Sequence, residues 1–408
     1  ASFILSEVAE LPKAFSYAQL RASVAQVGND TQPYQTSGAF ISQTAYNGQP
    51  TFSNQNFIPN ANLRPEQTTS YEVGADIRFL KDRIRLDATY YNALTKDQII
   101  SLPIAISSGY NQQVVNGGEV RTQGVELIAD LTPILTANFK WNTTFNFSSN
   151  TSRVESLPQS DGRLTLAYSR IYDSANQTVW FQVEEGWKIG DIYGTGYQKT
   201  EDGQFILTPS GSYIADNNLK KIGNYTPDFM LGWNNSFSYK NWSLSFLFDW
   251  RQGGELVSRT RALGTVGGQL AETANRPEEG IVPQGVVNTG TTENPQYVQN
   301  TTAVSAETYY RQFYDRNHEE NNIYDASYLK LRQFSVGYTF NLKDGFLGLS
   351  NGMDIDLALV GRNLFAISEI PHFDPEQLAV QGSGFVSGVE DMSYATTRSI
   401  GLKAGFNF

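Results

Sequence analysis

The chain has 408 residues, a formal net charge of -11 and no cysteine. This composition excludes disulfides, a thiol nucleophile and cysteine-based metal sites. The acidic balance disfavours nucleic acid as a partner, because phosphates would repel it. No apolar run approaches the roughly 20 residues of a membrane helix. The mean hydropathy of -0.37 suits a soluble protein or a β-barrel whose strands keep one polar face.

Alternating sequence patterns begin near the N-terminus and are clearest in Thr68–Thr95. Apolar and polar residues alternate from Tyr71 to Phe79, and the pattern resumes after a turn at Leu80–Asp82. Period-2 alternation of this length indicates a long strand with one apolar and one polar face. Crossing the outer membrane takes roughly 9–11 residues, about twice the length of most soluble strands. The pattern therefore predicts the wall of a transmembrane β-barrel.

The same criterion predicts about ten long strands along the chain. They are Ser16–Gly28, Thr68–Phe79, Arg83–Thr95, Glu119–Leu131, Leu135–Ser148, Asp228–Tyr239, Trp242–Gln252, Tyr324–Phe340, Asp354–Phe365 and Met392–Phe408.

Short and long connections alternate between these strands. The short ones are Leu80–Asp82, Thr132–Ile134, Lys240–Asn241 and Asn341–Met353, and the long ones are Asn29–Gln67, Lys96–Gly118, Ser149–Pro227, Gly253–Ile323 and Ala366–Asp391. Outer-membrane barrels have short periplasmic turns and longer extracellular loops. We therefore expect the short connections at the periplasmic rim and the long ones outside, with a short helix at Ala306–Asp315.

Aromatic residues gather beside the expected short turns. Phe79, Tyr239, Trp242 and Phe340 all lie there, where an interfacial aromatic belt would sit. In Trp242–Arg251 the apolar set alternates with serines and charged residues, apart from Leu247. The apolar rows are expected to face lipid.

Six motifs resemble elements of TonB-dependent outer-membrane transporters: the first two resemble hallmarks of that family as a whole, and the other four resemble elements of its SusC/RagA branch. In chain order they are Asn60–Glu66 followed by Ser70–Gly74, Asn116–Leu127, Val183–Tyr193, Asp325–Arg332, Gly361–Phe365 and Phe373–Glu376. They read NANLRPE with SYEVG, NGGEVRTQGVEL, VEEGWKIGDIY, DASYLKLR, GRNLF and FDPE, and they follow the order of the family along nearly the whole chain.

The resemblance implies active import of nutrient oligomers, glycans or peptides, in Bacteroidetes-type bacteria. It also implies an outer-membrane location, a SusD-like surface lipoprotein that covers the pore, and energy from TonB–ExbB–ExbD. The family barrel has 22 strands, closed around an N-terminal plug and preceded by a TonB box.

No segment of this sequence is recognised as a plug or a TonB box. We therefore expect residues 1–408 to be roughly the last ten strands of such a barrel, without a separate domain. The partners would include the N-terminal barrel and plug portion, outer-membrane lipid, and the oligosaccharide or peptide substrate. Closure of ten strands alone, or a native split into two chains, stays open.

Aromatic residues in the long connections are the candidate substrate-binding residues. Tyr110, Trp180, Trp187, Tyr193 and Tyr213 lie there, and sugars or peptides pack against such rings. The alternative is packing within the loops or against a lid. Charged residues on the polar strand faces, such as Arg78, Lys330 and Arg332, are expected to pair across strands or to contact a plug.

No catalytic, cofactor or metal site is predicted. Neither His318 nor His372 accompanies a G-x-S-x-G nucleophile elbow, and Asp315, Glu319 and Glu320 lack the spacing of an EF-hand. The competing hypothesis is a secreted β-rich protein that binds or degrades polysaccharide. Such an enzyme would need convergent carboxylates roughly 5–10 Å apart, and it would not explain the alternating connections.

Overall fold

The computed structural model describes residues 1–31, 33–158, 162–169, 179–315, 318–342, 353–377, 379–381 and 384–407. The chain divides into two compact units. Unit 1 comprises Ala1–Ala129, Ser148–Leu164 and Val183–Ile189, and unit 2 comprises Asp130–Phe147, Thr165–Gln182 and Gly190–Phe408. Among the described residues, no helix combines the length and the apolar character needed to span a membrane.

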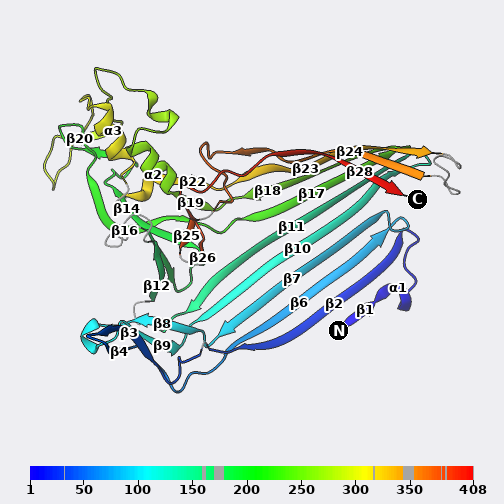
Figure 1. Cartoon of the computed structure of the whole chain (residues 1–408), viewed down its shortest axis with the longest axis horizontal. Coiled ribbons are helices and arrows are strands. Elements are labelled where there is room, and N and C mark those ends of the chain that lie inside the picture. The colour runs from blue at the N-terminus through cyan, green and yellow to red at the C-terminus, as the bar shows by residue number, and fades with distance from the viewer. Residues whose placement is uncertain are drawn as a thin grey trace. The chain divides into compact units, whose positions relative to one another are not determined.

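Eleven strands are hydrogen bonded in the order β1-β2-β6-β7-β10-β11-β17-β18-β23-β24-β28 (Figure 1). Their bounds are β1 Ser2–Ile4, β2 Phe15–Asn29, β6 Glu66–Phe79, β7 Ile84–Lys96, β10 Glu119–Leu135, β11 Phe139–Ser156, β17 Phe229–Tyr239, β18 Trp242–Gln252, β23 Tyr328–Leu342, β24 Met353–Ser368 and β28 Ser399–Asn407. Every pairing recorded in this sheet is antiparallel, as between β17 and β18. The expected all-β, antiparallel barrel wall is confirmed.

All ten expected strands are present, and the short β1 was not anticipated. Several boundaries were wrong. The expected turn Thr132–Ile134 lies inside β10, because β-branched residues continue the ladder to Leu135. The tenth strand begins at Ser399 rather than Met392, and Phe408 lies outside the described residues. Residues 343–352, most of the expected turn Asn341–Met353, also lie outside them.

The remaining strands and helices belong to the connections. In unit 1 lie α1 Leu5–Val8, β3 Phe40–Tyr46, β4 Gln49–Asn54, β5 Phe57–Ile58, β8 Ile99–Pro103, η1 Ile106–Ser108 and β9 Gln112–Asn116. The strands β12 Arg163–Ser169 and β13 Val179–Glu184 are divided between the two units. Unit 2 adds β14 Asp191–Tyr197, β15 Ile206–Leu207, β16 Ala215–Asn224, β19 Glu255–Ser258, α2 Arg259–Val266, η2 Ala271–Ala274, β20 Val286–Asn288, β21 Tyr297–Gln299, α3 Ala306–Phe313, η3 Glu319–Asn322, β22 Ile323–Asp325, β25 Ala379–Gln381, β26 Gly384–Val386 and β27 Val389–Glu390. The expected helix at Ala306–Asp315 is α3.

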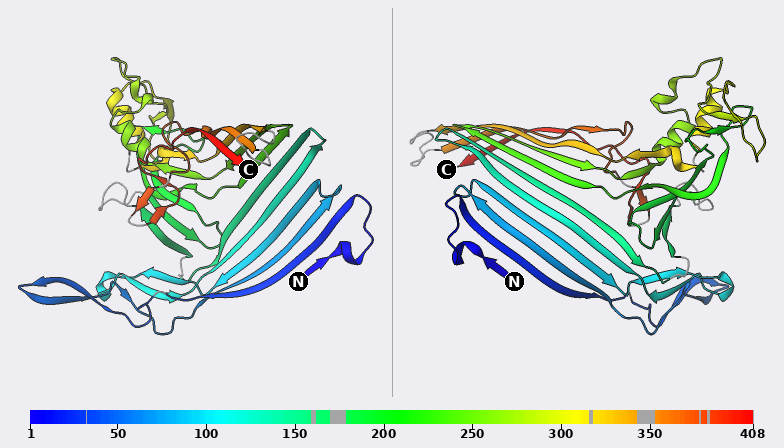
Figure 2. Two further views of the ribbon diagram at one scale, coloured as in Figure 1. Left: turned by 45° about the vertical axis from the view of Figure 1, so that its right-hand side comes forward. Right: turned by 180° about the vertical axis from the view of Figure 1, so that it is seen from behind.

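In unit 1, the wall strands present an exposed apolar row on one face. Its members are Leu20, Val24, Tyr71, Val73, Leu86 and Tyr90, and the register places them side by side across β2, β6 and β7. Charged residues occupy the opposite face. Figure 2 also shows the β3–β4 hairpin extending away from the wall strands of this unit.

In unit 2, the same division of faces holds. Leu357 and Leu402 are exposed, at 47% and 88% of their accessible surface, and the register puts Leu402 opposite Leu359 and Leu357 opposite Tyr338. Ser245 faces the other way, opposite Ser335. An exposed apolar row on a long strand suits hydrocarbon and not water, since large apolar patches are rare on soluble proteins.

Two indole N–H groups on this apolar face point into the wall. Trp141 donates to Asn235 Oδ1 at 3.1 Å, and Trp233 donates to Thr143 Oγ1 at 2.9 Å. Asn235 is the register partner of Phe246 and is 1% exposed. The rings therefore cover the polar atoms beneath them, as apolar surroundings require.

Among the described residues, the buried apolar clusters lie mainly in the connections, and Val154 near the end of wall strand β11 joins one of them. Val154, Leu164 and Val183 form a core in unit 1, whereas Ile192, Val257 and Val389 are central to one in unit 2. The long connections are thus folded structures, which fits the expectation that loops of this size have a function.

Candidate functional site

A pair of β-bulges shapes the wall of unit 2 next to its long connections. The β18–β23 register shifts between Leu247 and Phe248, and the β23–β24 register shifts between Leu331 and Gln333, so Arg332 is left out of both ladders. On β24 the compensating residue Asn363 has a φ of 49°. A bulge bends its strand and re-aims a side chain. Arg332 lies on the same strand face as Lys330, two residues earlier, and binds the same carboxylate, Glu376.

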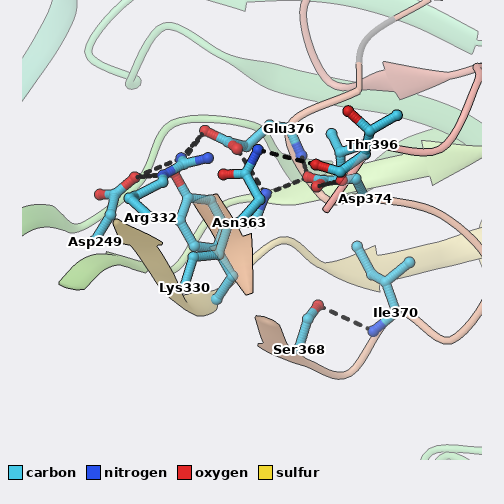
Figure 3. A network of polar contacts seen from close by, with 11 residues as sticks. Asp249, Lys330, Arg332, Asn363, Ser368, Ile370, Asp374, Glu376 and Thr396 are labelled. Atoms are coloured by element: carbon cyan, nitrogen blue, oxygen red, sulfur yellow. Dashed lines mark hydrogen bonds and ion pairs between the residues drawn. The ribbon is translucent and has the colours of Figure 1, made fainter. Parts of the chain in front are cut away.

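Five residues form an ion-pair network that we call the loop anchor: Asp249, Lys330, Arg332, Asp374 and Glu376 (Figure 3). The Lys330 side chain is 4% exposed, and its Nζ pairs with Asp374 and, at 2.6 Å, with Glu376 Oε2. Arg332 pairs with Glu376 and donates from Nε to Asp249 Oδ2 at 2.8 Å. Each buried charge therefore meets its opposite.

Further hydrogen bonds shape the connection after β24. Thr396 donates from Oγ1 to Asp374 Oδ2 at 2.6 Å, the Glu376 backbone N–H donates to Asp374 Oδ1 at 3.0 Å, and Tyr328 donates from its hydroxyl to Glu376 Oε1 at 3.1 Å. The motifs Asp325–Arg332 and Phe373–Glu376 thus meet in space. Together they fasten this connection to β18 and β23.

The electrostatics of the two loop carboxylates are a consequence of this geometry. Burial opposes ionisation of Glu376, but hydrogen bonds from Arg332 and Lys330 outweigh it and lower its pKa to about 2. For Asp374, burial is likewise outweighed by hydrogen bonds from Lys330 and Thr396, and the pKa is lowered. Both groups are therefore ionised at neutral pH.

Unit 1 contains a second charged network, here called the wall cluster: Arg21, Asp76, Arg78, Arg85 and Asp87. The register sets Asp76 opposite Asp87 and Arg78 opposite Arg85, two like-charged pairs that would repel. Diagonal contacts correct this, since Arg85 pairs with Asp76 at 3.2 Å and with Asp87 at 3.1 Å. Arg21 adds a contact of 2.6 Å to Asp87.

The unit 1 motifs fasten the ends of β6 and β9. Asn116 accepts from the Arg64 backbone N–H at 2.7 Å, and its Nδ2 donates to the carbonyls of Arg64 and Asp97 at 2.7 and 2.9 Å. Glu66 accepts from the Ile99 backbone N–H at 2.8 Å. These residues satisfy backbone groups that a loop would otherwise leave unpaired.

Gly124 has a steric role in the motif Asn116–Leu127. A Cβ at this position would lie 2.5 Å from the Tyr91 hydroxyl and 2.8 Å from the Ser149 carbonyl oxygen. A side chain would therefore force neighbouring strands apart. The glycine permits the close approach of β10 to its neighbours.

A family model described as TonB dependent receptor-like, beta-barrel, matches residues 11–248. The chain belongs to this family. It is 28% identical over 380 residues to TonB-dependent receptor P3 of Formosa agariphila, a match that covers 87% of this chain and 35% of that protein. It is 26% identical over 194 residues to TonB-dependent receptor SusC of Bacteroides thetaiotaomicron, covering 46% of this chain and 19% of SusC.

The fold of this TonB-dependent receptor barrel also matches a solved structure described as the RagAB peptide transporter. The TM-score is 0.69 at 18% identity, over 99% of this chain and 42% of the solved chain. The SusC/RagA resemblance read from the motifs is thus confirmed. The chain spans 35–40% of the length of the Formosa relatives it matches.

The five predicted substrate-binding aromatics of this receptor barrel occupy different places. In unit 1, Tyr110 is half-buried between η1 and β9, and Trp187 is 52% exposed in the turn after β13. In unit 2, Trp180 and Tyr193 are register partners on β13 and β14, with Tyr193 only 6% exposed. Tyr213 is buried among other rings. Of these residues, Trp187 offers the largest surface to a ligand, and their role in binding stays a prediction.

The sequence analysis named Lys330 and Arg332 as polar-face charges and quoted Asp374 and Glu376 as part of a motif, but it did not connect the two sets. A signal was available, since an acidic motif lies in the connection that follows the strand next to the one that carries the two basic residues.

Both histidines have carboxylate partners. His318 Nδ1 lies 2.9 Å from Asp315 Oδ2, and His372 Nε2 lies 2.9 Å from Glu272 Oε2. Within the described ranges, no group of three or more histidine, aspartate or glutamate residues is placed to hold a metal ion.

Proposed function

We propose that the chain is the C-terminal wall of an outer-membrane transporter that imports nutrient oligomers, glycans or peptides, with energy from TonB–ExbB–ExbD. The observation that supports this most is the division of the wall strands into an exposed apolar face and a charged face. Leu357, Leu359 and Leu402 on the first face suit lipid. The wall cluster and the loop anchor on the second suit a hydrated lumen.

The family of the chain, and the fraction of its relatives' length that the chain spans, suggest the partners in this proposal. The rest of the barrel and a plug would complete the pore, and a SusD-like surface lipoprotein would cover it. A solved structure of matching fold is described as the RagAB peptide transporter. Peptide is the substrate named for that protein, and a glycan or a peptide is proposed here.

In this proposal the folded long connections face outward and line the mouth of the pore. Tyr110, Trp180, Trp187, Tyr193 and Tyr213 would contribute to substrate contact there, with the exposed Trp187 first. The loop anchor holds the last long connection against the wall, so it would keep the mouth in one shape.

Uptake tests the proposal in the complete transporter that contains this chain. Cells that express it should accumulate labelled oligosaccharide or oligopeptide, and deletion of TonB should abolish uptake while leaving the barrel in the outer membrane. TonB-independent uptake, or recovery of the protein in soluble form without detergent, would overturn the proposal.

Orientation can be tested separately with single introduced thiols, since these 408 residues contain no cysteine of their own, and the complete transporter without an introduced thiol is the labelling control. Glu201→Cys in a long connection should react with a membrane-impermeant maleimide on intact cells. Asn138→Cys, in the short turn between β10 and β11, should react only after the outer membrane is opened. The reverse pattern would invert the proposed topology.

A further inference from the structure

A groove of about 580 Å³ opens to solvent among the loop strands of unit 2, beside β15, β20 and β21 (β20 in Figure 1). Its volume falls within the roughly 300–1,000 Å³ typical of small-molecule sites. The residues that line it include Gln204, Gln284, Gln299, Asn300, Val282 and Pro283. The groove contains no residue of the wall cluster or the loop anchor.

The backbone under the groove is tightly fixed. Gly285 has a φ of 146°, and a Cβ there would lie 2.5 Å from the Phe205 carbonyl oxygen. Gly285 accepts from the Asn300 backbone N–H at 2.9 Å, and Asn300 Nδ2 donates to the Pro283 carbonyl at 2.9 Å. A rigid floor lowers the entropy lost when a ligand binds.

A chain of hydrogen bonds orients the carboxamides at the rim. Asp202 can only accept when ionised, and Gln204 Nε2 donates to its Oδ2 at 2.7 Å. This fixes the Gln204 amide, whose Oε1 then accepts from Gln299 Nε2 at 2.9 Å. Gln299 is therefore held with its carbonyl oxygen and its second N–H available to a ligand.

The lining contains no ionisable side chain. Carboxamides, each with donors and an acceptor, stand beside the side chain of Val282, which is 48% exposed. Gln284 is exposed at the same rim. Such a surface brings no charged side chain to a carboxylate, phosphate or ammonium group. It matches a ligand that carries neighbouring hydroxyls on one side and C–H groups on another.

We propose that this groove binds a sugar unit of a neutral oligosaccharide. The carboxamides of Gln284 and Gln299 pair with adjacent hydroxyls, each of which both donates and accepts, and Val282 covers the C–H face of the ring. The groove would capture substrate at the cell surface. This role in import, though not the binding itself, rests on the proposed function.

Binding should be measured by calorimetry on the complete transporter purified in detergent. The probes are neutral gluco-, galacto- and xylo-tetrasaccharides, tetragalacturonate, a neutral tetrapeptide, and lipopolysaccharide from the same cells. We expect at least one neutral tetrasaccharide to bind, and Gln284→Ala and Gln299→Ala each to weaken it about threefold to tenfold, the loss of one hydrogen bond. Gln296→Ala, an exposed glutamine outside the groove, should leave affinity unchanged.

Several outcomes would overturn the proposal: no binding of a neutral saccharide, equal affinity in all variants, or a Gln299-dependent preference for the peptide or for tetragalacturonate. Gln299-dependent binding of lipopolysaccharide alone would keep the sugar chemistry and remove the nutrient role. TonB-independent uptake would refute the proposed transport mechanism, but it would leave Gln299-dependent sugar binding intact. Failure of the proposed function and failure of the groove proposal are therefore distinguishable.

Discussion

The wall cluster of unit 1 and the loop anchor of unit 2 are both ion-pair networks on the polar face of long strands, yet they are built differently. In the wall cluster every charge comes from β2, β6 or β7. Each of its residues either has more than one neighbour of opposite charge or has a partly exposed side chain. In the loop anchor, a single 4%-exposed lysine holds two carboxylates from a connection outside the sheet.

Because of this difference, losing one residue should matter less in the wall cluster than in the loop anchor. Removing one member of the wall cluster leaves the register intact, because backbone ladders hold the strands. Removing Lys330 leaves Asp374 without a cation and leaves Glu376 with Arg332 alone, so the connection loses the buried part of its fastening. Two networks with equal numbers of ion pairs can therefore contribute unequally to stability, depending on how buried the pairs are and on which other contacts hold the segments together.

The largest effect is expected from Lys330→Met. Breaking a buried pair by removing one partner costs about 3–5 kcal/mol, because the opposite charge stays behind without compensation. Chemical unfolding of the complete transporter in detergent should show a loss of this size. Limited proteolysis should also find new cleavage in residues 369–377.

The matched control is Lys403→Met on β28, where the lysine is exposed and lies opposite Ala358. It should change the free energy of unfolding by less than about 0.5 kcal/mol. Similar losses for the two variants would remove the distinction between a buried anchor and a surface charge.

The wall could be predicted from sequence because its signal is local. Alternation in Thr68–Phe79 or Trp242–Gln252 fixes which side chains share a face, and the antiparallel register is then set by short turns. The loop anchor could not be predicted. Nothing periodic encodes the path of residues 369–377, and the bulge at Arg332 interrupts the alternation just where the site forms.

The second-largest effect tests whether the charged face of the wall strands, which holds both networks, is the face in contact with water. Leu357→Arg places a charge on the exposed apolar row and should cost about 2–4 kcal/mol if that row faces lipid. Ser245→Arg, on the charged face, should be tolerated. The measurement is outer-membrane yield together with unfolding in detergent. Equal tolerance of both would place the networks in a soluble sheet and not in a barrel wall.

The aromatic candidates show a second limit of sequence reasoning. Tyr193 and Tyr213 lie in the expected long connections, yet these connections fold into cores that bury both side chains. Ring content alone could not distinguish a ligand platform from a core residue, because Phe and Tyr serve both purposes. Trp187 is exposed because it lies in the turn after β13, and the sequence alone did not reveal that position.

A smaller effect concerns the charge of Glu376. Glu376→Gln keeps the shape but removes the charge that Arg332 and Lys330 bind, at a cost of about 1.5–3 kcal/mol at pH 7. The folded pKa of about 2 lies below the ordinary value near 4.3. Stabilisation by the ionised carboxylate is therefore complete above about pH 4.3 and is lost as the pH falls toward about 2.

Unfolding of wild type and Glu376→Gln across pH 2–7 checks this. The difference in free energy should be constant from pH 7 to about 5, shrink below about pH 4.3, and still be measurable at pH 3. A difference that vanishes by pH 4 would mean that Glu376 titrates normally and that the loop anchor does not form.

The smallest effect is expected in the wall cluster. Arg21→Ala removes a side chain that is 36% exposed, and Asp87 keeps its contact of 3.1 Å with Arg85. The loss should be about 0.2–1 kcal/mol, as for exposed pairs, and a cycle with Asp87→Ala should give a coupling energy of the same size. Neither variant should alter proteolysis of residues 369–377. A loss of 3 kcal/mol or more would show that the wall cluster is as indispensable as the loop anchor, and burial of one lysine would then no longer explain why the two networks differ.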